Sequence, residues 1–82
     1  MATDSKIVQK IFGEVLREVR TERSISQQDL ALEADLDRTY ISLLERGLRQ
    51  PTLSTIISLA DAMGADAASL VRQTKERLDR SS

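Results

Sequence analysis

The chain has 82 residues, with 12 lysines and arginines against 13 aspartates and glutamates, and it contains neither histidine nor cysteine. This length predicts one small domain, whose limited buried surface makes association with a second subunit a reasonable expectation. Without histidine or cysteine the chain lacks the commonest metal ligands, the usual general base and any disulfide, and we expect no enzyme activity and no cofactor. No apolar run approaches the roughly 20 residues that span a bilayer, so we expect a soluble, cytoplasmic protein.

The first predicted element is a long amphipathic helix over residues 6 to 23. We expect a disordered lead over residues 1 to 5 and a single domain over residues 6 to 80. The apolar side chains of this helix recur at intervals of three and four residues, which is the spacing of one helix face. They are Ile7, Val8, Ile11, Phe12, Val15, Leu16 and Val19.

Two short helices joined by a tight turn are predicted next. The Ser26 hydroxyl can accept hydrogen bonds from the backbone amides that follow it, so a helix should begin at Gln27. Asp37 repeats this chemistry for a second helix, and only a turn fits between Ala34 and Asp37. The second helix carries polar side chains at its N-terminal end, as a helix-turn-helix does where it meets the major groove. They are Arg38, Thr39, Tyr40 and Ser42.

Two more helices complete a predicted all-α fold. Gly47 should end the second short helix, and Pro51 bars a helix from the loop that follows. Thr52 and Asp66 are predicted N-caps of the last two helices, and Gly64 should end the first of them. The expected core consists of Phe12, Leu16, Val19, Leu30, Ala31, Ala34, Leu36, Ile41, Leu44, Leu53, Ile56, Ile57, Ala60 and Leu70.

A motif of fixed spacing runs through the two short helices and the loop after them. It consists of Ser26-Gln27, Leu30-Ala31, Ile41-Ser42, Glu45, Gly47 and Pro51. On these residues the chain resembles the lambda-repressor-like, XRE-type helix-turn-helix family over about residues 12 to 78. Residues 36 to 42 look most like the controller proteins of restriction-modification systems, which are small all-helical dimers that regulate their own operons. The resemblance implies a compact five-helix DNA-binding domain, with the motif at about residues 26 to 46 and an extended first helix.

The resemblance also implies particular backbone and side-chain features. The family commonly has glycine where this chain has Ser24 and Asp35, and both positions favour a positive φ, so we expect either some backbone strain there or a different turn geometry. It further implies an ion pair between Arg20 and Glu45 that ties the first helix to the recognition helix. Both of these side chains should therefore belong to the scaffold and make no contact with DNA.

The candidate DNA contacts fall into two groups. Arginine can bond a guanine edge in bidentate fashion, and threonine or tyrosine can contact thymine methyls or phosphates, so we expect base contacts from Arg38, Thr39, Tyr40 and Ser42. An aromatic side chain such as Tyr40 can instead pack on the helix stem, and the other three can be merely solvated. Contacts to the DNA backbone are expected from Gln27, Gln28, Arg46, Arg49, Gln50 and Thr52, although Thr52 also caps its helix.

The distribution of charge matters more than the formal net charge of -1. Residues 38 to 50 contain Arg38, Arg46 and Arg49 but only one acid, Glu45, while the other acids are concentrated elsewhere. An acidic back and a basic edge are compatible with DNA binding, although with weaker nonspecific affinity than a basic protein has.

Together these observations predict a sequence-specific DNA-binding transcription regulator that acts as a homodimer on a two-fold symmetric operator and controls its own gene. A further partner to be considered is RNA polymerase, since contact with it would decide between activation and repression. The dimer interface is expected on the last helix, where Val71, Thr74 and Leu78 continue a stripe beyond Leu70. The alternative is an antitoxin-type module that masks a toxin through its apolar surfaces and binds DNA secondarily.

Overall fold

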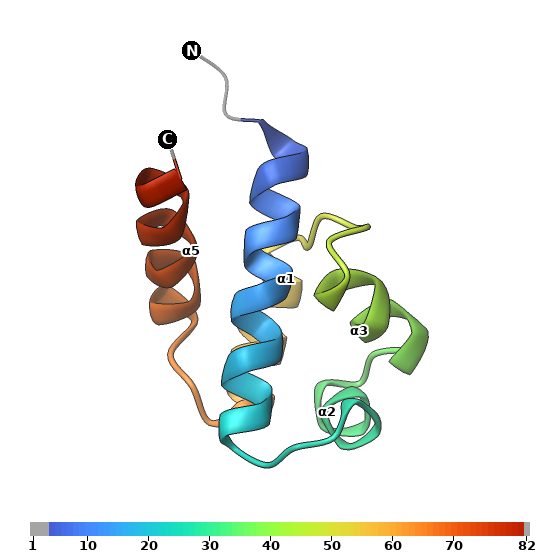
Figure 1. Cartoon of the computed structure of the whole chain (residues 1–82). Coiled ribbons are helices and arrows are strands. Elements are labelled where there is room, and N and C mark those ends of the chain that lie inside the picture. The colour runs from blue at the N-terminus through green and yellow to red at the C-terminus, as the bar shows by residue number, and fades with distance from the viewer. Residues whose placement is uncertain (1–3, 82) are drawn as a thin grey trace.

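The computed structural model describes residues 4–81, and over these residues it contains five α-helices and no strand. The predicted all-α, five-helix architecture is therefore confirmed. The long first helix lies between the last helix on one side and the two short helices on the other (Figure 1). The helices are α1 Ser5–Glu22, α2 Gln27–Ala34, α3 Arg38–Glu45, α4 Leu53–Met63 and α5 Ala67–Ser81.

The start of α1 corrects the predicted lead of residues 1 to 5. The carboxylate of Asp4 accepts hydrogen bonds from the backbone amides of Lys6 and Ile7, so Asp4 is the N-cap and the helix already includes Ser5. A carboxylate satisfies amides that have no partner within the first turn and interacts favourably with the helix dipole. Residues 1–3 of the predicted lead lie outside the described residues.

The other helix starts and turns follow the local chemistry of the sequence. Ser26, Asp37 and Thr52 each accept a hydrogen bond from a backbone amide in the first turn of their helices, over 2.8 to 3.1 Å. Asp66 does the same for an amide at the start of α5, over 3.1 Å. One residue before α2 and one after it adopt the left-handed conformation: Ser24 has φ 57° and Asp35 has φ 56°. The four predicted caps are confirmed, and both residues keep the positive φ that the family pattern favours.

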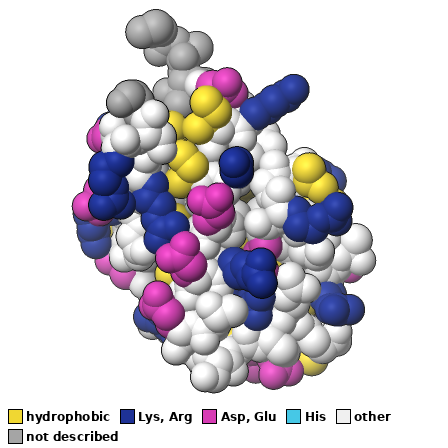
Figure 2. All heavy atoms as spheres, viewed as in Figure 1, with side chains coloured by type: hydrophobic (Ala, Val, Ile, Leu, Met, Phe, Trp, Pro, Cys, Tyr) yellow, Lys and Arg dark blue, Asp and Glu magenta, His cyan; other side chains and the backbone are white. Residues whose placement is uncertain are grey.

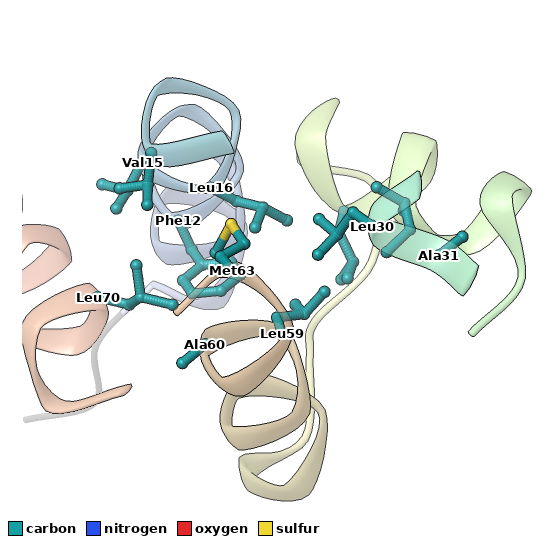
Figure 3. Close-up of a cluster of buried hydrophobic side chains, with 12 residues drawn as sticks. Phe12, Val15, Leu16, Leu30, Ala31, Leu59, Ala60, Met63 and Leu70 are labelled. Carbon is teal, nitrogen blue, oxygen red and sulfur yellow. The ribbon is translucent and has the colours of Figure 1, made fainter. Parts of the chain in front are cut away.

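The hydrophobic core is built where α1 crosses α4, with α2, α3 and α5 closing its sides (Figure 3). Two residues of α4 that were predicted to lie in the core do not, because Leu53 is 70 % and Ile57 44 % exposed. Helix α4 is apolar on more than one side, and packing against α2 and α5 selects the side that carries Leu59, which is fully buried. The buried cluster consists of Phe12, Val15, Leu16, Val19, Leu30, Ala31, Ile41, Leu44, Leu59, Ala60, Met63 and Leu70.

Helix α1 and the end of α3 approach each other closely at Gly13 and Gly47. A Cβ atom on Gly13 would lie 2.7 Å from the carbonyl oxygen of Glu45, and one on Gly47 would lie 2.8 Å from Cα of Lys10. Gly47 also has φ 73°, a conformation that glycine adopts without cost. These backbone contacts hold the C-terminal end of α3 against α1 in one position.

Candidate nucleic-acid interface

The two short helices α2 and α3 form the candidate site, with the N-terminal half of α3 at the surface. Arg38 and Thr39 are exposed in its first turn, and Ser42 is half-buried one turn later. Together with Gln27 at the start of α2 they line a shallow hollow of ≈ 190 Å³. The structure therefore brings three of the four predicted base-contact residues together around one concave polar surface.

Tyr40 lies differently from the other three predicted base-contact residues. Its side chain is half-buried and packs against the hydrophobic core. The guanidinium carbon of Arg49 lies 5.6 Å from the centre of its ring, within the range of a cation–π interaction. This arrangement corresponds to the alternative considered for Tyr40, namely packing on the helix stem, and it holds Arg49 beside α3.

A hydrogen-bond network around Glu45 fastens the helix pair to α1. The Glu45 carboxylate accepts from Nε of Arg20 over 2.6 Å and from Nη2 over 3.0 Å, and it also accepts from Nε2 of Gln27 over 3.0 Å. Arg20 donates in addition from Nη1 to the carbonyl oxygen of Ile25 over 2.8 Å. The predicted pair of Arg20 and Glu45 is thus confirmed, and the sequence did not reveal that Gln27 joins it.

The ion pair at the centre of this network is largely buried, and its hydrogen bonds shift the pKa of Arg20. The side chains of Arg20 and Glu45 are 11 % and 4 % exposed. The hydrogen bonds that Arg20 donates to the Glu45 carboxylate raise the pKa of Arg20 above its usual range, and burial only partly opposes this shift. The Arg20 guanidinium therefore stays protonated, and its hydrogen bonds tie α1 to the end of α3 and to the segment before α2.

Most of the residues predicted to contact the DNA backbone are exposed. Gln28, Arg46, Arg49, Gln50 and Thr52 are exposed, while Gln27 is half-buried and one of its amide N–H groups is used by Glu45. The exposed basic side chains among them lie at the end of α3 and in the loop that follows. One basic residue near them was missed from the sequence: Arg17 of α1 lines a hollow together with Arg46. Its position one turn before Arg20 is the signal that could have identified it.

Acidic and basic side chains lie next to one another on the face that carries α1. Figure 2 shows acidic side chains in a row along the middle of the face that carries α1, with lysines and arginines to both sides. On this face Arg77 of α5 forms a bidentate ion pair with Glu18 of α1, both N···O distances being 2.7 Å. Glu14 and Glu22 lie near enough to Arg77 to contribute to its raised pKa, although hydrogen bonding to Glu18 is the larger cause.

An apolar groove of ≈ 370 Å³ lies on another part of the molecule, between α1, α4 and α5. Of the three predicted interface residues, Val71 is 48 % exposed and Leu78 is half-buried, and both line this groove. Thr74 is 7 % exposed and its hydroxyl donates to the carbonyl oxygen of Leu70, so it mainly contributes to packing within the chain. The remaining lining residues are Val8, Phe12, Gln50, Pro51, Ile56 and Lys75.

The described residues provide neither a membrane-spanning helix nor a metal-binding cluster. Within residues 4–81 no helix combines the length and apolar character needed to cross a bilayer. The same residues contain no group of three histidine, cysteine, aspartate or glutamate side chains able to hold a metal ion.

Known proteins match this chain in sequence and in structure. Residues 16–70 match the family described as Helix-turn-helix. The control protein C.BamHI of Bacillus amyloliquefaciens is 40% identical over 65 residues, which cover 78% of this chain and 80% of that protein. The control protein C.SmaI of Serratia marcescens is 39% identical over 64 residues, with 78% and 76% covered.

A solved structure agrees with these matches. The crystal structure of the restriction-modification controller protein C.AhdI from Aeromonas hydrophila has a TM-score of 0.74 to this structure and is 40% identical, covering 76% of this chain and 94% of that one. Residues 16–70, which match the family, include both short helices and the residues of the Glu45 network. The chain belongs to the XRE-type helix-turn-helix family of DNA-binding transcription regulators, and within it the chain is similar to restriction-modification controller proteins.

Proposed function

We propose that this protein binds a two-fold symmetric operator as a homodimer and regulates its own gene. The observation that carries the proposal is the presentation of Arg38 and Thr39 at the exposed N-terminal end of α3, which Arg20, Glu45 and Gln27 hold rigidly against α1. A fixed helix end that carries free polar side chains is suited to reading base edges in the major groove.

Arg38 is the main candidate for reading a base directly. It is exposed, and the part of the structure described here gives its guanidinium no carboxylate partner, so its donors are available to O6 and N7 of a guanine. Thr39 and Ser42 line the same hollow and are placed for neighbouring bases. Because Tyr40 is largely used in packing, we assign it the lesser role of supporting Arg49, which contacts the backbone.

Contacts to phosphates surround this reading surface. Arg46, Arg49 and Gln50 follow the recognition helix and are exposed, and Gln28 is exposed in the first turn of α2. Gln27 can offer a phosphate only its second amide N–H and its backbone amide, since its first amide N–H is bonded to Glu45. Thr52 caps α4 and contributes mainly to the local structure of the loop.

The homodimer is proposed to form on the face of α4 and α5. Recognition helices that enter successive major grooves must lie about 34 Å apart, so each lies about 17 Å from the two-fold axis. The Cα atoms of this domain span 20 Å in its two shorter directions, and α1 separates α5 from α3 (Figure 1). A contact through the groove and the exposed side chains Leu53, Ile57 and Val71 is compatible with that spacing, and it would cover apolar surface that water otherwise contacts.

The test is a gel shift and a footprint on the DNA immediately upstream of the gene. We expect two protected half-sites with centres about one helical turn apart, and no equivalent binding to a scrambled duplex. Arg38→Ala should weaken binding to the operator by about 1 to 3 kcal/mol and reduce the preference over the scrambled duplex. Equal losses on both duplexes would refute its role as a base reader.

Two further measurements address the partners. Transcription from the upstream region with purified RNA polymerase, with and without the protein, gives the sign of regulation. Absence of any protected site upstream, together with a stable complex with the product of a neighbouring gene, would instead favour the antitoxin-type function.

A further inference from the structure

Two arginines from different segments of the chain line one hollow at the junction of α1, α2 and α3. Arg17 lies on α1 and Arg46 directly follows α3, and both side chains are exposed. They line one hollow of ≈ 240 Å³, whose remaining lining residues are Arg20, Gln27, Ser42 and Glu45. Gln27 and Ser42 also line the hollow beside Arg38, so the two hollows adjoin on the same side of the helix pair.

The only acid among these lining residues does not neutralise the two exposed arginines. Both oxygens of Glu45 already accept hydrogen bonds from Arg20, and one accepts from Gln27 as well. Within residues 4–81, neither Arg17 nor Arg46 has an acidic partner within salt-bridge distance. The hollow is therefore lined by three arginines and one glutamate, and two of these positive charges remain available to a ligand.

The position of Arg17 relative to the recognition helix is fixed by the backbone. Residues four apart lie on the same helix face, so Arg17 is on the face of α1 that carries Gly13, and Arg20 lies one turn further on. Gly13 contacts the carbonyl oxygens at the end of α3, and Arg20 is tied to Glu45. Arg17 lies between these two fixed points on α1, beside the recognition helix.

We propose that Arg17 and Arg46 together bind one backbone phosphate of the operator, which extends the DNA interface from the helix pair onto α1. A phosphodiester is the ligand whose oxygens match two guanidinium groups that approach from different sides, and binding it costs no existing ion pair. The contact carries no sequence information and sets the register of α3 in the groove. The proposal rests on the proposed function, because it assumes that α3 faces DNA.

The test compares the wild type with Arg17→Ala, Arg17→Lys and Arg80→Ala, on operator and scrambled duplexes, across a series of salt concentrations. Arg80 is exposed in the last turn of α5, so Arg80→Ala removes the same charge far from the hollow. For Arg17→Ala we expect roughly tenfold weaker binding to both duplexes at low salt and a salt slope that is smaller by about 0.9 per bound domain. Arg17→Lys should recover most of the slope, and Arg80→Ala should change neither quantity.

A chemically modified operator locates the contact. Single uncharged methylphosphonates are placed in turn along each half-site, and the loss of affinity is measured for the wild type and for Arg17→Ala. We expect one position at which neutralising the phosphate weakens Arg17→Ala less than the wild type, because only Arg46 still contacts that phosphate, and the same position for Arg46→Ala. Unchanged melting temperatures would separate this result from a general loss of structure.

Three outcomes would overturn the proposal. If Arg17→Ala binds both duplexes with the wild-type slope, then Arg17 does not contact DNA. If no methylphosphonate position is shared by Arg17→Ala and Arg46→Ala, the two arginines do not bind one phosphate. If the slope is unchanged but a carboxylate-bearing protein partner binds less well, the hollow binds protein and not DNA. Failure of the wild type to bind any duplex would refute the proposed function itself and is distinct from all three.

Discussion

Removing the carboxylate of Glu45 should destabilise the domain more than its position near the surface suggests. Glu45→Ala deletes three hydrogen bonds and leaves the Arg20 guanidinium, 11 % exposed, with only the carbonyl oxygen of Ile25 as a partner. Breaking a buried ion pair from one side costs about 3 to 5 kcal/mol, and the carbonyl bond that remains places this case near the lower limit. The expected loss of about 3 kcal/mol is large for a domain of 82 residues, whose total free energy of unfolding is on the order of 4 to 12 kcal/mol.

Thermal unfolding followed by circular dichroism measures this loss. For a domain of this size, 3 kcal/mol corresponds to a fall in melting temperature of roughly 12 to 24 °C. Gln27→Ala removes one of the three bonds and leaves the ion pair intact, so it should cost only about 1 kcal/mol. Glu33→Ala, which removes an exposed acid from α2, is the matched control and should stay within about 0.5 kcal/mol of the wild type.

DNA binding measured below the melting temperature of Glu45→Ala separates an effect on the orientation of α3 from an effect on the stability of the domain. If the network holds α3 in place, Glu45→Ala should bind the operator more weakly even where it is fully folded, whereas a control variant destabilised elsewhere should not. A melting temperature within about 3 °C of the wild type would refute the burial argument. Equal effects of Glu45→Ala and Gln27→Ala would show that the ion pair is not the main tie between α1 and α3.

Three further predictions follow from other contacts. Gly13→Ala places a methyl group against backbone carbonyl oxygens and should cost about 1 to 3 kcal/mol in urea unfolding; a wild-type midpoint would contradict the close approach of α1 and α3. The hydrogen bonds that Arg77 donates to Glu18 lower the pKa of Glu18. The stability that this ion pair contributes is therefore complete above the ordinary glutamate pKa of 4.5 and disappears as the pH falls through the lowered pKa. Glu18→Gln should therefore flatten the loss of melting temperature on acidification, and an unchanged acid profile would exclude the pair as its cause. Val71→Glu should give a folded monomer in sedimentation, whereas Leu32→Glu, which changes an even more exposed apolar residue on α2, should keep the wild-type mass; a dimeric Val71→Glu would move the interface elsewhere.

The helix boundaries could be predicted because they depend on local chemistry. Ser26, Asp37 and Thr52 cap their helices with their own side chains, so the signal and its effect lie within a few residues of each other. The family pattern, which places glycine at the positions of Ser24 and Asp35, favours the left-handed conformation there, and the structure has it. The tie between Arg20 and Glu45 came from the same resemblance and not from any feature of composition.

What the sequence did not predict depends on packing between distant segments. Helix α4 is apolar on several sides, so its spacing alone did not decide between Leu53 and Leu59 as the core residue. The bond from Gln27 to Glu45 and the burial of Thr74 both require knowledge of how neighbouring helices lie against each other. The hollow that Arg17 and Arg46 share is of the same kind, because it forms only when α1 and α3 are in contact.

Helix α1 links the reading surface to the proposed dimer face. One side of it holds α3 through the backbone contact at Gly13 and the pair of Arg20 with Glu45, and another side holds α5 through the pair of Glu18 with Arg77. In the proposed dimer α5 lies at the two-fold axis and α1 joins it to α3. The distance between the two recognition helices therefore depends on both the α1–α3 contact and the α1–α5 contact. The contacts on the α3 side involve buried groups and backbone atoms, whereas the Glu18 side chain on the α5 side is 53% exposed and its pair is screened by solvent. Leu70 of α5 also packs in the buried cluster with Phe12 and Val15 of α1. The proposed dimer therefore positions each α3 through two packed contacts, and a substitution in either one should change the half-site spacing that the dimer accepts.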